Sequence, residues 1–188
     1  MENDLIFTLY NDARTVFKLN DIAMLSKDTN FESLSKRVNY IVRNKKLLNL
    51  RKGIYTKSSY NKEELACRIY IPSYISLEYV LQKAGVIFQF NSAITSISYL
   101  SRTIEVGENE LIYRKLKNEM LADMRGIIRY PDGVNIASPE RALLDMLYLN
   151  GDTYFDNLNS IDKDFCFKLL PLYGSKILSE RVKKLFEK

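Results

Sequence analysis

One segment, residues 27–57, carries more positive charge than the chain as a whole. It holds nine lysine or arginine residues against two acids, whereas the net charge of all 188 residues is +5. Residues 61–188 contain equal numbers of basic and acidic residues. The chain therefore joins a basic N-terminal part to an electrically neutral C-terminal part, and such a split favours two modules with different tasks.

Composition restricts the chemistry that the chain can perform. There is no histidine, which removes the commonest general base and most zinc and iron ligand sets. The seven glycines match neither common phosphate-binding loop spacing. Cys67 and Cys166 each lie in an apolar segment, where buried and unreactive thiols are expected. We therefore predict no catalytic residues, no metal site and no cofactor.

The location of the protein is also predicted from simple patterns. No apolar run approaches the roughly 20 residues that a membrane helix needs. The first residues include acids and lack the basic region that begins a signal peptide. We expect a cytoplasmic protein that does not use a membrane as a partner.

The basic segment contains a helix with two contrasting faces. Residues 31–45 are expected to be helical, with Asn30 as the N-cap. Apolar residues recur at helical spacing and form one stripe, made of Phe31, Leu34, Val38, Ile41 and Val42. The side chains opposite this stripe are Ser33, Lys36, Tyr40, Arg43 and Asn44, with Arg37 beside them. This face offers cations for phosphates and polar groups for base edges, which is typical of a helix that binds DNA.

The surrounding elements predict a winged helix-turn-helix. Helices are expected over 2–13 and 21–27, the second capped by Asn20, with a short β-prone stretch at 15–17. After the basic helix, residues 47–50 and 54–57 flank the turn Arg51-Lys52-Gly53 and predict a hairpin. In such a fold the third helix enters the major groove and the wing lies near the backbone. The alternative is a small helical domain whose basic face is merely solvated.

The C-terminal part has the pattern of an α+β domain. Helices are expected after Asn61, over 77–84 after a Ser76 cap, after Ser138, over 162–170 and over 175–188. Residues 93–117 are rich in β-prone residues, and Pro131-Asp132-Gly133 predicts a turn between two short strands. Asp145 lies four residues after Arg141, which predicts an intrahelical ion pair. We therefore expect a winged helix-turn-helix domain over residues 1–59, followed by a mixed α/β domain with an antiparallel sheet over 60–188.

Four stretches of sequence resemble a known family. They are RKGIY (51–55), PSYISLEYVLQKAGVIFQ (72–89), ITSISYLSR (94–102) and SPERALLDMLYL (138–149). In this order they resemble the AbiEi-type antitoxins, which are transcriptional regulators of type IV toxin–antitoxin systems in abortive infection and phage defence. The resemblance extends from about residue 15 to residue 158.

The resemblance implies both a function and a set of binding residues. It implies that the winged helix represses its own operon by binding inverted repeats in promoter DNA. It also implies that the C-terminal domain neutralises a nucleotidyltransferase toxin, a process that need not involve a stable complex. The implied DNA-binding positions are Lys36, Arg37, Tyr40 and Arg43 on the helix, and Arg51 and Lys52 on the wing. Tyr55, in the second strand of the hairpin, is a further candidate for DNA binding.

Two other functions fit parts of the sequence. Asp132, Glu140 and Arg141 resemble part of a metal-dependent nuclease site, although such chemistry needs clustered carboxylates to hold Mg²⁺. Asp132 also suits its predicted turn, and Glu140 suits the start of a helix. A ligand-sensing repressor is the other possibility, since thirteen tyrosines could line an effector pocket, but such residues more often pack in cores.

Overall fold

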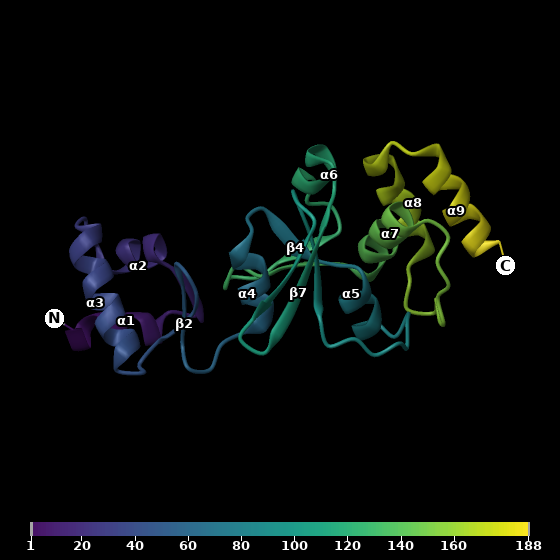
Figure 1. Ribbon diagram of the computed structural model, residues 1–188. Coiled ribbons are helices and arrows are strands. Elements are labelled where there is room, and N and C mark those ends of the chain that lie inside the picture. The colour runs from purple at the N-terminus through teal and green to yellow at the C-terminus, as the bar shows by residue number, and fades with distance from the viewer. Residues whose placement is uncertain (1, 188) are drawn as a thin grey trace.

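The computed structural model describes residues 2–187, with side chains from residue 4 onward, as an elongated α+β molecule (Figure 1). The first six elements form what we call the N-terminal unit, and the others form the C-terminal unit. In Figure 1 the helices of the N-terminal unit lie at one end of the molecule, and α8 and α9 lie at the other. None of the described helices is both long and apolar enough to span a membrane.

The N-terminal unit combines three helices with a three-stranded antiparallel sheet of order β1-β3-β2. Its elements are α1 (Glu2–Asn11), β1 (Val16–Lys18), α2 (Leu19–Ser26), α3 (Phe31–Arg43), β2 (Leu48–Arg51) and β3 (Ile54–Thr56). Every predicted element is present within a few residues. The cap of α2 differs, because the helix begins at Leu19, before Asn20, and Asp21 accepts a hydrogen bond from the Lys18 amide at 2.8 Å.

The C-terminal unit is built on a six-stranded sheet of order β6-β7-β5-β4-β9-β8. Its strands are β4 (Ser73–Ile75), β5 (Ile94–Ser98), β6 (Arg102–Val106), β7 (Asn109–Lys115), β8 (Ile127–Arg129) and β9 (Asn135–Ala137). Its helices are α4 (Lys62–Ile69), α5 (Glu78–Lys83), α6 (Asn118–Ala122), α7 (Pro139–Asn150), α8 (Lys163–Leu169), the 3₁₀ helix η1 (Leu170–Tyr173) and α9 (Lys176–Phe186). The predicted end of the last helix, Lys188, lies outside the described residues.

The prediction of an antiparallel sheet was only partly right. Three neighbouring pairs are antiparallel, but β4 pairs with β9 and β5 pairs with β7 in parallel. The chain reverses at residues 99–101 into the edge strand β6, and β7 then returns between β6 and β5. Adjacent β-prone runs suggest a meander, and nothing local in the sequence signals that a later strand will insert between two earlier ones.

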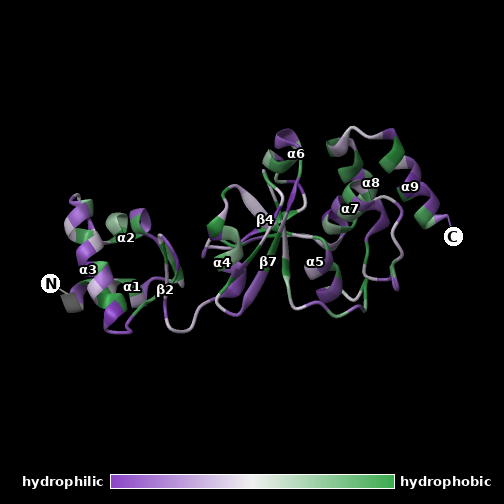
Figure 2. Cartoon of the chain, in the orientation of Figure 1, coloured by the Kyte–Doolittle hydropathy of each residue, from purple (hydrophilic) through white to green (hydrophobic). Residues whose placement is uncertain are grey.

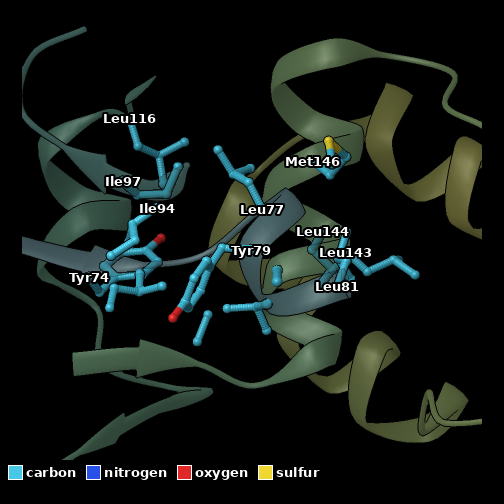
Figure 3. Packing of buried hydrophobic residues seen from close by; sticks show 14 of the residues in the cluster. Tyr74, Leu77, Tyr79, Leu81, Ile94, Ile97, Leu116, Leu143, Leu144 and Met146 are labelled. Carbon is cyan, nitrogen blue, oxygen red and sulfur yellow. The ribbon is translucent and has the colours of Figure 1, made fainter. Parts of the chain in front are cut away.

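The core of the C-terminal unit lies between the sheet and helices α5 and α7. Figure 3 shows Leu143 and Leu144 of α7 close to Leu81 of α5, with Ile94 and Ile97 of β5 across from them. Each of these five side chains is almost completely buried. The predicted caps Asn61 and Ser138 are confirmed, since their side chains accept from the amides of Glu63 and Arg141.

Ser76 does not cap α5 as predicted. Leu77 occupies the N-cap position with a φ of 60°, and the Ser76 hydroxyl instead donates to Asp145 at 2.8 Å. The α7 ion pair is present, with Arg141 Nε 3.4 Å from Asp145 Oδ1, but both side chains are completely buried. A buried ion pair requires further hydrogen bonds, and Ser76 supplies one of them.

A buried carboxylate joins the two units. Glu64 of α4 is fully buried and accepts from the Thr15 amide at 2.7 Å, the Thr15 hydroxyl at 2.7 Å and the Val16 amide at 3.1 Å. Val16 and Ile54 of the three-stranded sheet also belong to the hydrophobic cluster of the C-terminal unit. The sheet is therefore covered on both faces, by its own helices on one side and by the C-terminal unit on the other.

Removing this carboxylate should destabilise the chain. Glu64→Ala leaves the buried Val16 amide and the partly buried Thr15 amide without this acceptor, and a buried donor left unpaired costs about 1–3 kcal/mol. We expect a loss of about 2–4 kcal/mol in the free energy of unfolding, measured by urea denaturation. Glu64→Gln keeps one carbonyl oxygen and should lose less. Equal stability of Glu64→Ala and the wild type would show that these hydrogen bonds do not hold the units together.

The stability difference between the wild type and Glu64→Gln should depend on pH. Burial raises the pKa of Glu64 above its ordinary value of 4.5, although hydrogen bonds from Thr15 oppose the shift. The folded chain then binds this proton more tightly than the unfolded chain, so stability falls as pH rises from 4.5 towards the folded pKa. The stability of the wild type relative to Glu64→Gln should therefore be greatest below pH 4.5. It should fall as pH rises and become constant above the pKa of Glu64 in the folded chain. If the stability of the wild type relative to Glu64→Gln rises with pH, the pKa of Glu64 is not raised in the folded chain.

Candidate nucleic-acid interface

Helix α3 has one buried face and one exposed face. Leu34, Val38 and Ile41 are completely buried against the other helices of the N-terminal unit. The Asn30 side chain caps the helix by accepting from the Ser33 amide at 3.0 Å. In Figure 2, hydrophilic and hydrophobic patches alternate along α3, as its amphipathic sequence requires. Phe31 was predicted to join the buried stripe, but it is 48% exposed because it begins the helix beyond the core.

Most of the predicted binding residues on α3 reach solvent. Ser33, Lys36, Tyr40, Arg43 and Asn44 are all exposed, and Arg37 is half-buried. Figure 1 shows α3 on the side of the N-terminal unit that lies farthest from the C-terminal unit. A long, straight partner such as a duplex could therefore approach this face without meeting the rest of the molecule.

Two of these cations already have carboxylate partners. Lys36 lies 2.7 Å from Glu32 in a pair whose side chains are both highly exposed, and an exposed pair of this kind contributes little stability. Arg37 donates to Asp28 at 2.8 Å and so ties the turn before α3 to the helix. By contrast, Arg43 has no carboxylate within ion-pair distance among the described residues. Arg43 is therefore the helix cation most available to a phosphate or a base.

Lys45 and Lys46 contribute to the charge of the basic segment but were not predicted to belong to the binding face. Both are exposed in the turn that follows α3, where Lys45 has a left-handed φ of 57°. The Tyr10 hydroxyl donates to the Lys46 carbonyl at 2.7 Å and fixes this turn against α1. Three cations within four residues, Arg43 to Lys46, were the signal that could have identified this extension of the face.

The hairpin places its three candidate residues differently. Lys52 is exposed at the β2–β3 turn, and Arg51 is half-buried. Tyr55 is only 6% exposed and packs in the hydrophobic cluster of the N-terminal unit. β3 is the central strand of a sheet covered on both faces, so its side chains are used for packing. We therefore leave Tyr55 out of the interface.

The residues that resembled a nuclease site have structural partners. Asp132 accepts from the Val134 amide at 3.1 Å within its turn. Glu140 is buried and accepts from the Asp162 amide at 3.1 Å, whereas Arg141 belongs to the buried pair with Asp145. Among the side chains of residues 4–187, no three metal-ligating groups come close enough to hold an ion.

Both cysteines are buried and free, as predicted. Burial raises the pKa of the Cys67 thiol to about 11 and that of Cys166 to about 12. Both thiols are therefore protonated at neutral pH, and a protonated thiol is a poor nucleophile.

We use the name basic surface for the exposed cations Lys36, Arg43, Lys45 and Lys46 of α3 and the turn that follows it, together with the exposed Lys52 at the hairpin turn. No protein-family model matches the chain, and no curated protein matches it.

Proposed function

We propose that the chain is a DNA-binding antitoxin of the AbiEi type, which represses its own operon and neutralises a nucleotidyltransferase toxin. The order of elements in the N-terminal unit supports a winged helix-turn-helix, in which α3 would be the recognition helix and the β2–β3 hairpin the wing. The observation that carries the proposal is the basic surface: Lys36 and Arg43 lie on the exposed side of α3, opposite the buried residues Leu34, Val38 and Ile41, and Lys45 and Lys46 are exposed in the turn that follows.

The charge distribution favours DNA over an acidic protein as the partner. Phosphate contacts supply most of the affinity of proteins for duplex DNA, and lysine and arginine side chains provide them. Tyr40 is 53% exposed between Lys36 and Arg43, where its ring could pack against a base or sugar. A helix of this kind commonly works as one of two copies on inverted repeats.

The antitoxin activity is assigned to the C-terminal unit through the four stretches of resemblance, three of which lie in it. Many residues of these stretches support the core, including Tyr74, Leu81, Ile97 and Leu143. The same packing means that a fragment beginning at residue 61 would lose Glu64's partners and expose the cluster that Val16 and Ile54 help to form. The two activities are therefore best separated in the full chain.

A separation-of-function experiment tests this proposal. The full chain carrying Arg43→Ala, Lys45→Ala and Lys46→Ala should fail to repress a reporter driven by the upstream region of its operon. The same chain should still protect cells that express the nucleotidyltransferase that the proposal expects to be encoded beside it, because the substitutions lie far from the C-terminal unit. Repression that remains at the wild-type level would exclude this surface from DNA binding. Loss of protection at normal protein levels would contradict the division of labour.

A further inference from the structure

A cavity of about 270 Å³ opens beside the first residues of strands β4 and β9 in the C-terminal unit. Its walls include Arg68 of α4, Arg129 of β8 and Tyr74 of β4, together with Leu121 and Met124. None of the described residues that line it is an aspartate or a glutamate. The volume lies just below the range of about 300–1,000 Å³ that is typical of small-molecule pockets, so only a small ligand would fit.

Arg68 has an unusual environment on the wall of this cavity. Only 16% of its side chain is exposed, and its Nε atom is buried without a hydrogen-bond partner. Neither terminal nitrogen donates a hydrogen bond to any residue that the structure describes. Buried polar groups are nearly always hydrogen-bonded, so a largely buried arginine with no hydrogen-bond acceptor among the described residues is a candidate for holding an anion.

Two carboxylates near Arg68 do not remove this deficit. Asp21 of the N-terminal unit lies 3.6 Å from Nη1, and Glu64 lies 4.0 Å from Nε. These distances allow electrostatic attraction but are too long for hydrogen bonds. Glu64 already accepts from Thr15 and Val16, as described above. The charge of Arg68 is therefore partly balanced, while its two terminal nitrogens make no hydrogen bond to the described residues and remain available to a ligand.

The rest of the cavity suits an anion that carries an apolar body. Arg129, at the end of the edge strand β8, is exposed and supplies a second positive charge on the wall. Gly133 leaves room for the Arg68 guanidinium, because a Cβ atom added at this glycine would lie only 3.2 Å from Arg68 Nη2. Leu121, Met124 and Pro72 provide apolar wall on the same cavity.

We propose that this cavity binds a small organic oxyanion, a carboxylate or a phosphate monoester, through Arg68 and Arg129, with its apolar part against Leu121 and Met124. Guanidinium groups match both anions because two parallel N–H donors can face two oxygens. The site is distinct from the basic surface, and its existence does not depend on DNA binding by α3.

Isothermal titration calorimetry of the full chain tests the proposal with matched probes. Phenyl phosphate and benzoate are the anionic probes, and phenol and benzamide are their uncharged counterparts. At least one anionic probe should bind with at least about tenfold higher affinity than its uncharged counterpart. The two anions together show whether the site prefers a phosphate or a carboxylate.

Three variants locate the binding. Arg129→Gln, at an exposed position, should weaken anion binding about tenfold without unfolding the chain, and Arg68→Gln should weaken it at least as much. Arg125→Gln is the control, because Arg125 is exposed, pairs with Asp123 and does not line the cavity. Absence of binding at millimolar concentrations, equal affinity for the uncharged probes, or unchanged binding in both Arg129→Gln and Arg68→Gln would overturn the proposal.

Discussion

Asp145→Ala is expected to lower the free energy of unfolding by about 3–5 kcal/mol, because it leaves the Arg141 guanidinium buried without its counter-ion. Asp145 is completely buried and accepts from Tyr173 at 2.6 Å, Ser76 at 2.8 Å and Tyr74 at 3.0 Å. Burial raises the pKa of Asp145, whereas Arg141 and these hydroxyl donors oppose the shift. Urea denaturation followed by circular dichroism measures the effect.

The position of this network explains why the effect should be large. Arg141 also donates to the carbonyls of Met120 at 2.9 Å and Arg125 at 3.0 Å, so the network joins α7 to the segment that contains α6. The hydroxyl groups of Tyr74 and Tyr173 donate to Asp145 and so connect β4 and η1 to the same network. One substitution therefore disturbs contacts among four parts of the C-terminal unit.

A double variant provides the control for this prediction. Once Asp145 is absent, replacing Arg141 by Met removes the uncompensated charge, so Arg141→Met/Asp145→Ala should be less destabilised than the sum of the two single variants. Asp145→Asn keeps the shape of the side chain and should fall between the wild type and Asp145→Ala. Additive effects, or a loss below about 1 kcal/mol for Asp145→Ala, would show that the pair is not a buried electrostatic unit.

The second large effect is expected in DNA binding. Lys36→Ala/Arg43→Ala should weaken binding to the upstream region of the operon by about 2–4 kcal/mol, or roughly 30- to 1,000-fold in a gel-shift assay. Arg43 should account for most of this loss, because it has no carboxylate partner among the described residues, whereas Lys36 must first exchange its contact with Glu32. The exchange costs little, since that pair is exposed.

The matched control removes the same number of positive charges from the C-terminal unit. Lys117→Ala/Lys176→Ala also removes two exposed positive charges, but both lie in the C-terminal unit. This control should bind DNA within about twofold of the wild type if long-range charge is unimportant. If both double variants lose affinity equally, overall net charge rather than the basic surface determines binding.

Local features of the structure could be predicted from sequence to a large extent. The caps Asn30, Asn61 and Ser138 each accept from a nearby amide as expected, because a cap depends on residues two or three positions away. The buried stripe of α3 followed from its helical spacing. Exposure of Lys36, Tyr40 and Arg43 on the opposite face followed from the same geometry.

The larger errors involve contacts between residues far apart in the chain. Ser76 is a good capping residue by local criteria, but a buried acid 69 positions later takes its hydroxyl. Tyr55 follows a basic turn, yet the sheet that contains it is covered on both faces. The parallel pairing of strands in the six-stranded sheet also depends on topology, and so do the hydrogen bonds from Thr15 to Glu64. The spacing of residues along the sequence does not encode topology.

The dependence of DNA affinity on salt tests the central claim most directly. Fluorescence anisotropy with the labelled upstream duplex, at a series of KCl concentrations, gives the slope of log Kd against log salt. A wild-type chain that uses the basic surface should show a steep slope, and Arg43→Ala/Lys45→Ala/Lys46→Ala should reduce its magnitude by about one for each phosphate that the variant no longer neutralises. Binding that is insensitive to salt, or a slope unchanged in the triple variant, would contradict DNA recognition by this surface.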